Sequence, residues 1–192
     1  MAGPVVVGGI KLKIKYQKSK FRKMFVNIRD SKKLTPRQRE KWFRFLTTHP
    51  AIDWAFAKVW PKVIDRINIA KASNLGARRV YKKLNNVTSR FHSKNNNIVR
   101  ACREHTLLDG GLYLSPKIPH KTIIKGDEKV PMIAAASIIA KVIRDRTMLR
   151  LHKKYPQYRF DVHKGYGTKL HKDLIKKFGF SEVHRKSFKI RN

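Results

Sequence analysis

The chain has 192 residues, a length that suits one domain, and its hydrophobic content of 41% supports a buried core and excludes a globally disordered chain. It carries 46 Lys and Arg residues against 12 Asp and Glu residues, and the net charge of +34 predicts contact with a polyanion such as nucleic acid. A single cysteine excludes an internal disulfide, and the longest apolar run, nine residues from Met132 to Ala140, is far short of the roughly 20 that span a membrane.

The first two predicted elements are a strand and a capped helix. Apolar residues alternate through residues 4–14 around a pair of glycines, Gly8–Gly9, which is typical of a bent strand. Thr35, Pro36 and Gln38 then supply an N-cap, a first helical residue and a reciprocal cap, so we expect a helix that ends near residue 48. Its buried side chains are expected to be Trp42, Phe43 and either Phe45 or Leu46.

The middle of the chain predicts a strand, a helix and a loop. Residues 52–57 alternate between large apolar and small or acidic residues, which indicates a strand. Apolar residues then recur at helical spacing, so we expect one helix from Val63 or Ile67 to Leu84. The polar residues 85–97 predict a loop or a loosened helix end.

The second half predicts two short buried strands, residues 105–108 and 122–124, each closely followed by an acid. Pro131 then begins a long helix that runs to about Lys153, and residues 169–178 predict a further short helix. Strands that alternate with helices favour an α/β fold, in which ligands gather at the carboxyl ends of the strands.

Asp109 and Asp127, the two acids at these strand ends, are candidate metal ligands and catalytic residues. Carboxylate oxygens suit hard cations such as Mg²⁺, and phosphodiester hydrolysis commonly uses two such cations about 4 Å apart. The alternative is that Asp127 caps the helix that Pro131 begins, where the helix dipole favours an anion. Both interpretations stay open from the residues alone.

The segment HKGYGT, residues 163–168, is a candidate contact to nucleic acid. Glycines let the backbone approach a phosphate, Lys164 adds charge, and Tyr166 can stack on a sugar or a base. A tight turn around a packed tyrosine is the alternative. Asp145 is expected to pair with a neighbouring base, and Asp30 to stabilise a turn. The eight histidines are scattered in the sequence, so a zinc site is not expected.

Taken together, these segments resemble ribonuclease HII. They follow the order of the family's motifs and cover nearly the whole chain, and the combination of KGD, AAASIIAKV-x-RD and HKGYGT is highly specific. The matching pieces are AGPVVVGG, DSKKLTPRQRE, INIAKASNLGARRV, LLDGG, TIIKGDEKVPMIAAASIIAKVIRDRTM, YPQY, VHKGYGT and HRKSF.

The resemblance implies an RNase H-like mixed sheet flanked by helices, with a catalytic core at residues 1–155 and a C-terminal helical extension at residues 156–192 that carries HKGYGT. It implies an endonuclease that cuts the RNA strand of RNA–DNA hybrids, and single ribonucleotides embedded in duplex DNA, by two-metal-ion hydrolysis with Mn²⁺ or Mg²⁺, leaving 5′-phosphate ends. The positions matching Asp109 and Asp127 hold the metals, and the tyrosine matching Tyr166 contacts the sugar next to the RNA–DNA junction. Candidate phosphate contacts are Lys32, Lys33 and Lys164.

The sequence departs from the family pattern at its start. Family members have a central strand that ends in Asp-Glu-Ala-Gly-Arg-Gly before the segment matching Ala2–Gly9, and this motif is absent from the printed chain. We therefore expect a missing central strand, with unpaired strand edges in mid-sheet. Three explanations are open: a start codon assigned too late, which we favour, a fragment completed by another chain, or a catalytically inactive hybrid binder.

Our leading hypothesis is a metal-dependent ribonuclease H of type 2, monomeric and cytoplasmic, whose printed chain binds Mg²⁺ weakly and cleaves little. The rival is a non-catalytic basic protein that binds RNA–DNA hybrids or other nucleic acid, which the charge favours. A ribosome-associated basic protein is a third possibility, without support from any motif.

Overall fold

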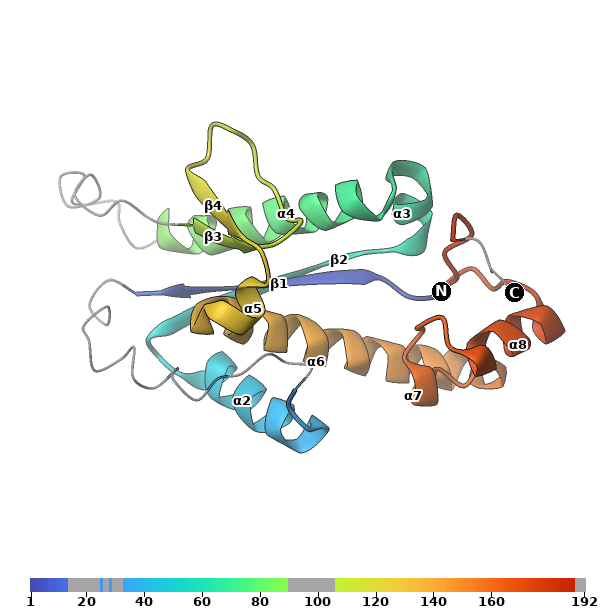
Figure 1. Ribbon diagram of the computed structural model, residues 1–192. Helices are drawn as coiled ribbons and strands as arrows, with labels where there is room; N and C mark the ends of the chain where they lie inside the picture. The colour runs from blue at the N-terminus through green and yellow to red at the C-terminus, as the bar shows by residue number, and fades with distance from the viewer. Residues whose placement is uncertain (14–24, 26–27, 29–32, 90–105, 189–192) are drawn as a thin grey trace.

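The computed structural model describes residues 1–13, Phe25, Ile28, 33–89 and 106–188. Its elements alternate between strands and helices along the chain, and Figure 1 shows their arrangement. In order they are β1 (Val5–Leu12), α2 (Pro36–Thr48), β2 (Ile52–Val59), α3 (Pro61–Ile67), α4 (Ile69–Ser89), β3 (Thr106–Asp109), β4 (His120–Ile123), α5 (Gly126–Lys129), α6 (Pro131–Lys154), a 3₁₀ turn (Pro156–Tyr158), α7 (Phe160–His163) and α8 (Lys169–Phe178).

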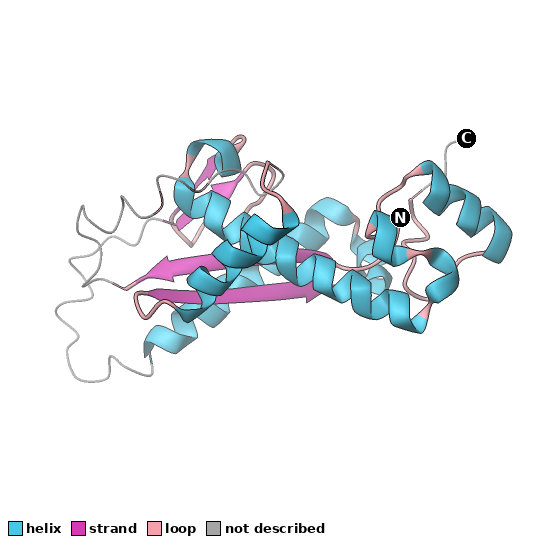
Figure 2. Ribbon diagram, turned by 90° about the horizontal axis from the view of Figure 1, so that it is seen from below, coloured by secondary structure: helices cyan, strands magenta, loops and turns pink. Residues whose placement is uncertain are grey.

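The first two strands form an antiparallel pair that lies between two long helices. Val5 of β1 pairs with Val59 of β2, and Leu12 pairs with Ile52 at the other end. Helix α6 packs against β1, and helix α4 packs against both strands. The long helix α6 lies alongside this strand pair in both ribbon views (Figures 1 and 2).

Two adjacent glycines let the helices approach β1 closely. A Cβ atom at Gly8 would lie 2.4 Å from the carbonyl oxygen of Ala136 in α6, and one at Gly9 would lie 2.4 Å from Cγ1 of Val80 in α4. We expected these glycines at a bend, but β1 is one strand from Val5 to Leu12. The glycines are required because no side chain fits at either position.

Helix α2 begins as its sequence predicts. The hydroxyl of Thr35 accepts a hydrogen bond from the N–H of Gln38, and the side chain of Gln38 accepts one from the N–H of Thr35. This reciprocal pair satisfies two donors that the first turn would otherwise leave unpaired. Phe43 and Leu46 are buried, whereas the expected Trp42 is only partly buried.

The single helix predicted between residues 63 and 84 is wrong, because the structure has two helices there. Asn68 interrupts them with a φ of 66° and a ψ of 168°, which lie outside the helical region. Its side-chain oxygen also accepts a hydrogen bond from the N–H of Lys71 in the first turn of α4. Helix α4 then continues to Ser89, so residues 85–89 of the predicted loop or loosened helix end are helical. Residues 90–97 lie outside the described residues.

The centre of the fold is helix α6. It begins at Pro131, one residue after the N-cap, and ends one residue beyond the predicted Lys153. Its buried side chains pack against β1, β2 and α2 to form the largest apolar cluster. The buried residues of that cluster are Phe25, Ile28, Phe43, Leu46, Ala51, Ile52, Ala134, Ala135, Ile138, Ile139 and Val142.

Strands β3 and β4 form a second, parallel pair, and within the described residues no backbone ladder joins it to β1–β2. The single mixed sheet that we expected is thus seen as two strand pairs. They are linked by packing, because Leu108 of β3 is buried in an apolar cluster against which Val7 of β1 also packs. The expectation that a central strand is missing between them stays a prediction.

The first residues of the chain pack into the C-terminal part. The N–H of Ala2 donates to the carbonyl of Gly165, the N–H of Gly3 donates to that of Val183, and the N–H of Arg185 donates to that of Met1. Figure 1 accordingly shows the N-terminus near the C-terminal part that carries α7 and α8. The division at residue 155 into a core and an extension stays a prediction. No helix in the described ranges is long and apolar enough to cross a membrane.

Candidate metal and nucleic-acid site

Asp109 is the last residue of β3, and backbone donors fix its carboxylate. Its Oδ1 accepts hydrogen bonds from the N–H of Gly110 at 2.8 Å and from the N–H of Gly126 at 2.9 Å. The second bond joins the end of β3 to the turn that follows β4. The carboxylate of Asp109 therefore points toward the segment that carries Asp127.

Asp127 lies in the first turn of the four-residue helix α5 and is only 8% exposed. Lys125, before it, adopts a left-handed conformation with a φ of 53°. Helix α6 has Val130 as its N-cap, with no side-chain capping bond, so Asp127 does not cap the helix that Pro131 begins. The predicted alternative, in which Asp127 caps this helix, is therefore wrong.

Gly126 lies between the two acids in space. A Cβ atom at this position would lie 2.6 Å from Cδ1 of Ile133 and 3.3 Å from Oδ1 of Asp109. A larger residue would therefore displace the turn from Asp109. The parallel register, in which Asp109 is the partner of Ile123, aligns the two strand ends on which the acids depend.

Two carboxylates are few for a metal site of protein ligands alone. In the ranges that the structure describes, no group of three or more His, Cys, Asp or Glu residues is arranged to hold a metal ion. Mg²⁺ and Mn²⁺ accept oxygen ligands, and Mg²⁺ is often held by one or two carboxylates together with substrate phosphates and water. The chemistry of Asp109 and Asp127 fits such a cation.

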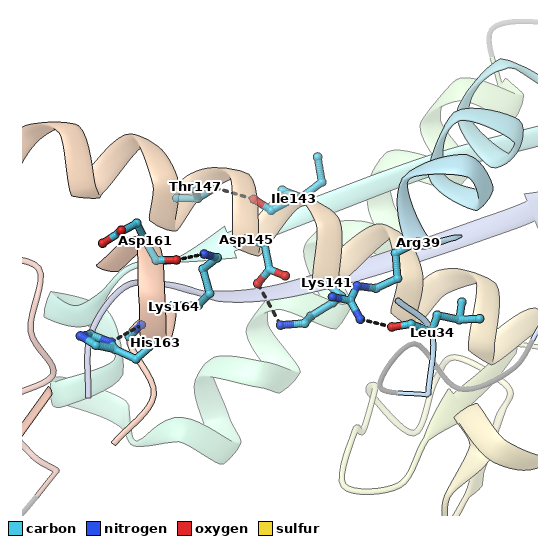
Figure 3. A network of polar contacts seen from close by, with 10 residues as sticks. Leu34, Arg39, Lys141, Ile143, Asp145, Thr147, Asp161, His163 and Lys164 are labelled. Atoms are coloured by element: carbon cyan, nitrogen blue, oxygen red, sulfur yellow. Dashed lines mark hydrogen bonds and ion pairs between the residues drawn. The ribbon is translucent and has the colours of Figure 1, made fainter. Parts of the chain in front are cut away.

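Tyr166 follows α7 in the HKGYGT segment and is 44% exposed. The guanidinium carbon of Arg144 lies 4.3 Å from its ring centroid, and the Nζ atom of Lys141 lies 5.4 Å from it. Both bases come from α6, and Lys141 also pairs with Asp145 at 2.9 Å, as Figure 3 shows. The ion pair predicted for Asp145 is confirmed.

Arg144 carries one unused donor. Its Nη1 atom is buried and has no hydrogen-bond partner among the described residues. Arg185 is close enough that burial, and then the charge of Arg144, lower the pKa of Arg185 to about 10. The neighbourhood of Tyr166 is therefore strongly positive, which suits an anionic ligand.

The predicted lysines occupy different settings. Lys164 follows the last residue of α7 with a φ of 48°, and its amino group donates to the carbonyl of Asp161 (Figure 3). Lys33 is exposed just before α2, Lys32 lies outside the described residues, and so does Asp30. The roles of Lys32, Lys33 and Lys164 as phosphate contacts stay predictions.

Three buried histidines that the sequence left scattered meet beneath the Tyr166 turn. The rings of His163 and His171 stack at 4.2 Å between centroids, and Nε2 of His171 lies 3.1 Å from Nε2 of His184. Burial lowers the pKa of His171 to about 3 and that of His184 to about 4, and it also lowers the pKa of His163. We expect all three to be neutral at pH 7.

Comparison with known proteins identifies the family. The profile described as ribonuclease HII matches residues 1–191 of this chain. The chain belongs to the ribonuclease HII family. A ribonuclease HII of Chlamydia trachomatis serovar L2 is 41% identical over 188 residues, covering 98% of this chain and 76% of the relative. That of Chlamydia caviae is 40% identical over 188 residues and is covered over 78% of its length.

Solved structures agree on the fold. The ribonuclease HII in a complex with PCNA from Archaeoglobus fulgidus has a TM-score of 0.63 at 22% identity, covering 100% of this chain and 90% of that one. Ribonuclease H2 from Pyrococcus horikoshii has a TM-score of 0.55 at 21% identity, covering 96% and 94%. The predicted RNase H-like fold is therefore confirmed.

Membership of the ribonuclease HII family confirms the predicted enzyme class. The chain is a metal-dependent endoribonuclease of the ribonuclease H type 2 class, which acts on RNA–DNA hybrids. Sequence reasoning missed the two bases that flank Tyr166 and the histidines beneath it. A helical spacing of three residues places Lys141 and Arg144 on one face of α6, but only tertiary packing brings that face to Tyr166.

Proposed function

We propose that Asp109 and Asp127 are the metal ligands with which this ribonuclease HII cuts the RNA strand of RNA–DNA hybrids and single ribonucleotides embedded in duplex DNA. When bound, Mg²⁺ or Mn²⁺ would activate water and stabilise the leaving 3′ oxygen. The residues supply fixed oxygen ligands, with Asp109 held by backbone donors and Asp127 buried at the following turn. The products carry 5′-phosphate ends.

One observation supports this proposal above the others. The hydrogen bond from Gly126 to Oδ1 of Asp109 brings the residue before Asp127 against the first carboxylate. Two acids from neighbouring parallel strand ends therefore lie in one small region. Such convergence is what a cation between them requires.

Around this centre, basic and aromatic residues bind the duplex. Lys32, Lys33 and Lys164 contact phosphates, and Tyr166 contacts the sugar beside the RNA–DNA junction. The net charge of +34 supports phosphate binding that weakens as salt rises. We assign catalysis to residues 1–155 and the Tyr166 contact to an extension formed by residues 156–192, in a cytoplasmic monomer.

The test is cleavage of a duplex with one embedded ribonucleotide, at a series of Mn²⁺ and Mg²⁺ concentrations. Loss of one ligand removes several kcal/mol of transition-state stabilisation, so Asp109→Asn and Asp127→Asn should each slow cleavage by roughly 100-fold or more. Both variants should also weaken Mn²⁺ binding measured by electron paramagnetic resonance. Glu182→Gln, which alters an exposed acid that pairs with Lys154, is the matched control.

Wild-type rates in either aspartate variant would refute these ligand assignments. A second candidate function is non-catalytic hybrid binding, which is favoured by the charge and by the shortage of acids around the two aspartates in the described ranges. It predicts salt-sensitive binding of the duplex with no cut at any metal concentration, and equal affinity in the wild type and the two aspartate variants.

A further inference from the structure

Hydrogen-bond directions fix the proton on each ring of the buried histidine pair. The N–H of Ser181 donates to Nδ1 of His184 at 3.0 Å, so the proton of His184 is on Nε2. That atom donates to Nε2 of His171 at 3.1 Å, which leaves the proton of His171 on Nδ1. Nδ1 of His171 then donates to the carbonyl oxygen of Tyr166 at 2.7 Å. The contacts form one directed chain from Ser181 to the backbone of Tyr166.

A third histidine, His163, holds the preceding residue of the same turn. Nδ1 of His163 accepts a hydrogen bond from the N–H of Gly165 at 3.1 Å, and its Nε2 donates to the carbonyl of Tyr158 at 2.7 Å. Gly165 has a φ of 76°, and a Cβ atom there would lie 2.6 Å from the carbonyl oxygen of Ala2. The backbone on both sides of the Gly165–Tyr166 peptide is thus tied to buried rings.

The side chain of Tyr166 projects from this tethered backbone to the bases of α6. The ring lies against Arg144 and Lys141, while its own backbone is held from α8 through His171. A phenol is rigid about its backbone, with only two side-chain torsions to fix. A shift of the carbonyl beneath it therefore moves the ring relative to Arg144.

We propose that His171 is a positioning residue for Tyr166. Its Nδ1–H group fixes the carbonyl of Tyr166, and the bond from His184 keeps the proton on that nitrogen. Tyr166 is thereby held against Arg144 before the duplex arrives, so binding does not have to order the turn. The inference deepens the proposed function of Tyr166 and rests on it.

Two substitutions of His171 distinguish the role of its Nδ1 atom from that of its Nε2 atom. In His171→Asn the side-chain amide takes the place of Nδ1 and keeps a donor for the carbonyl of Tyr166. In His171→Gln the amide oxygen takes the place of Nε2, which keeps the acceptor for His184 but removes the bond to Tyr166. Ile175→Val, a buried change in the same helix, is the control for a general loss of stability.

For the duplex with one ribonucleotide, His171→Gln should raise KM by roughly three- to tenfold, the value of one hydrogen bond, with kcat nearly unchanged. His171→Asn and Ile175→Val should stay within about twofold of the wild type. The ring resonances of ¹³C-labelled Tyr166 should shift in His171→Gln and not in Ile175→Val. Equal KM values in His171→Gln and His171→Asn, or ring shifts that follow thermal stability in all variants, would overturn the proposal.

A double-mutant cycle with Tyr166→Ala tests whether His171 acts through Tyr166. His171→Gln should have no further effect on KM once Tyr166 is removed, and additive effects would contradict the inference. If Tyr166→Ala alone leaves KM unchanged, the proposed contact of Tyr166 with the substrate is wrong. The ring resonances then decide the positioning role by themselves, because they report the turn without any substrate.

Discussion

Acidification should lower the stability of the protein, because His171 and His184 are buried in neutral form. This loss should begin at a higher pH than the one at which carboxylates titrate. His171 and His184 have folded-state pKa values of about 3 and about 4, against 6.5 in the unfolded chain. As pH falls through 6.5 the unfolded state takes up protons that the folded state does not. Stability is therefore present above pH 6.5 and is lost below it, until the folded rings titrate.

The magnitude follows from the two pKa values of each ring. Integrating proton uptake from pH 7 to pH 5 gives a loss of about 2 kcal/mol in the free energy of unfolding for each histidine that stays neutral when folded. His171 and His184 together should therefore lower it by about 4 kcal/mol. The pKa values of Asp65 and Asp161 are below 3.8, so these two groups lower the stability of the protein only at a lower pH, where they become protonated.

The assay is urea unfolding at pH 7, 6 and 5 and constant ionic strength, followed by circular dichroism. His171→Gln should be less stable than the wild type at pH 7 and should lose about 2 kcal/mol less between pH 7 and pH 5, because one titrating ring is gone. A wild-type loss under about 1 kcal/mol, or an undiminished loss in His171→Gln, would show that these rings are charged or exposed in the folded protein.

Three further predictions concern residues that stabilise the fold around the site. In each case the free energy of unfolding is measured by thermal or urea unfolding. Gly8→Ala should destabilise by about 3 kcal/mol because its Cβ would overlap the backbone of α6, whereas Gly167→Ala, with its nearest neighbour at 3.8 Å, should be nearly neutral. Ile138→Ala, at a fully buried position of α6, should lose roughly 2–5 kcal/mol, and Ile124→Ala, at a 75% exposed position, should stay within about 0.5 kcal/mol of the wild type. Thr35→Ala should lose about 1 kcal/mol with the capping box of α2, and an unchanged midpoint would show that this cap adds nothing.

The ends of several helices could be predicted because residues next to them in the sequence determine them. Thr35, Pro36 and Gln38 start α2 through contacts within one turn, and Gly179 follows α8 where the apolar period ends. Such signals lie within a few residues of the element they control. The split at Asn68 was also local, but the helical period of the apolar residues on either side masked it.

The tertiary relations were harder to predict, because they depend on which surfaces meet. Asp109 and Asp127 could be predicted as neighbours because α/β folds place the carboxyl ends of their strands at one edge of the sheet. This rule needs no knowledge of side-chain packing. The meeting of His163, His171 and His184 depends on how α7, α8 and the last turn fold against α6, and sequence spacing says nothing of that. The same is true of Arg144 and Tyr166, which lie on separate elements.

The surroundings of Asp109 differ from those of the acids that form ion pairs. In a chain with 46 Lys and Arg residues, several described acids form ion pairs, as Asp145 does with Lys141 and Glu40 with Arg146. Asp109 differs, because within the described residues its contacts are two backbone N–H groups, both at Oδ1. Within the same residues its other oxygen accepts no hydrogen bond, which suits the metal ligand that we propose. Among the described residues no base forms an ion pair with Asp109, and this supports our proposal that it holds a divalent ion.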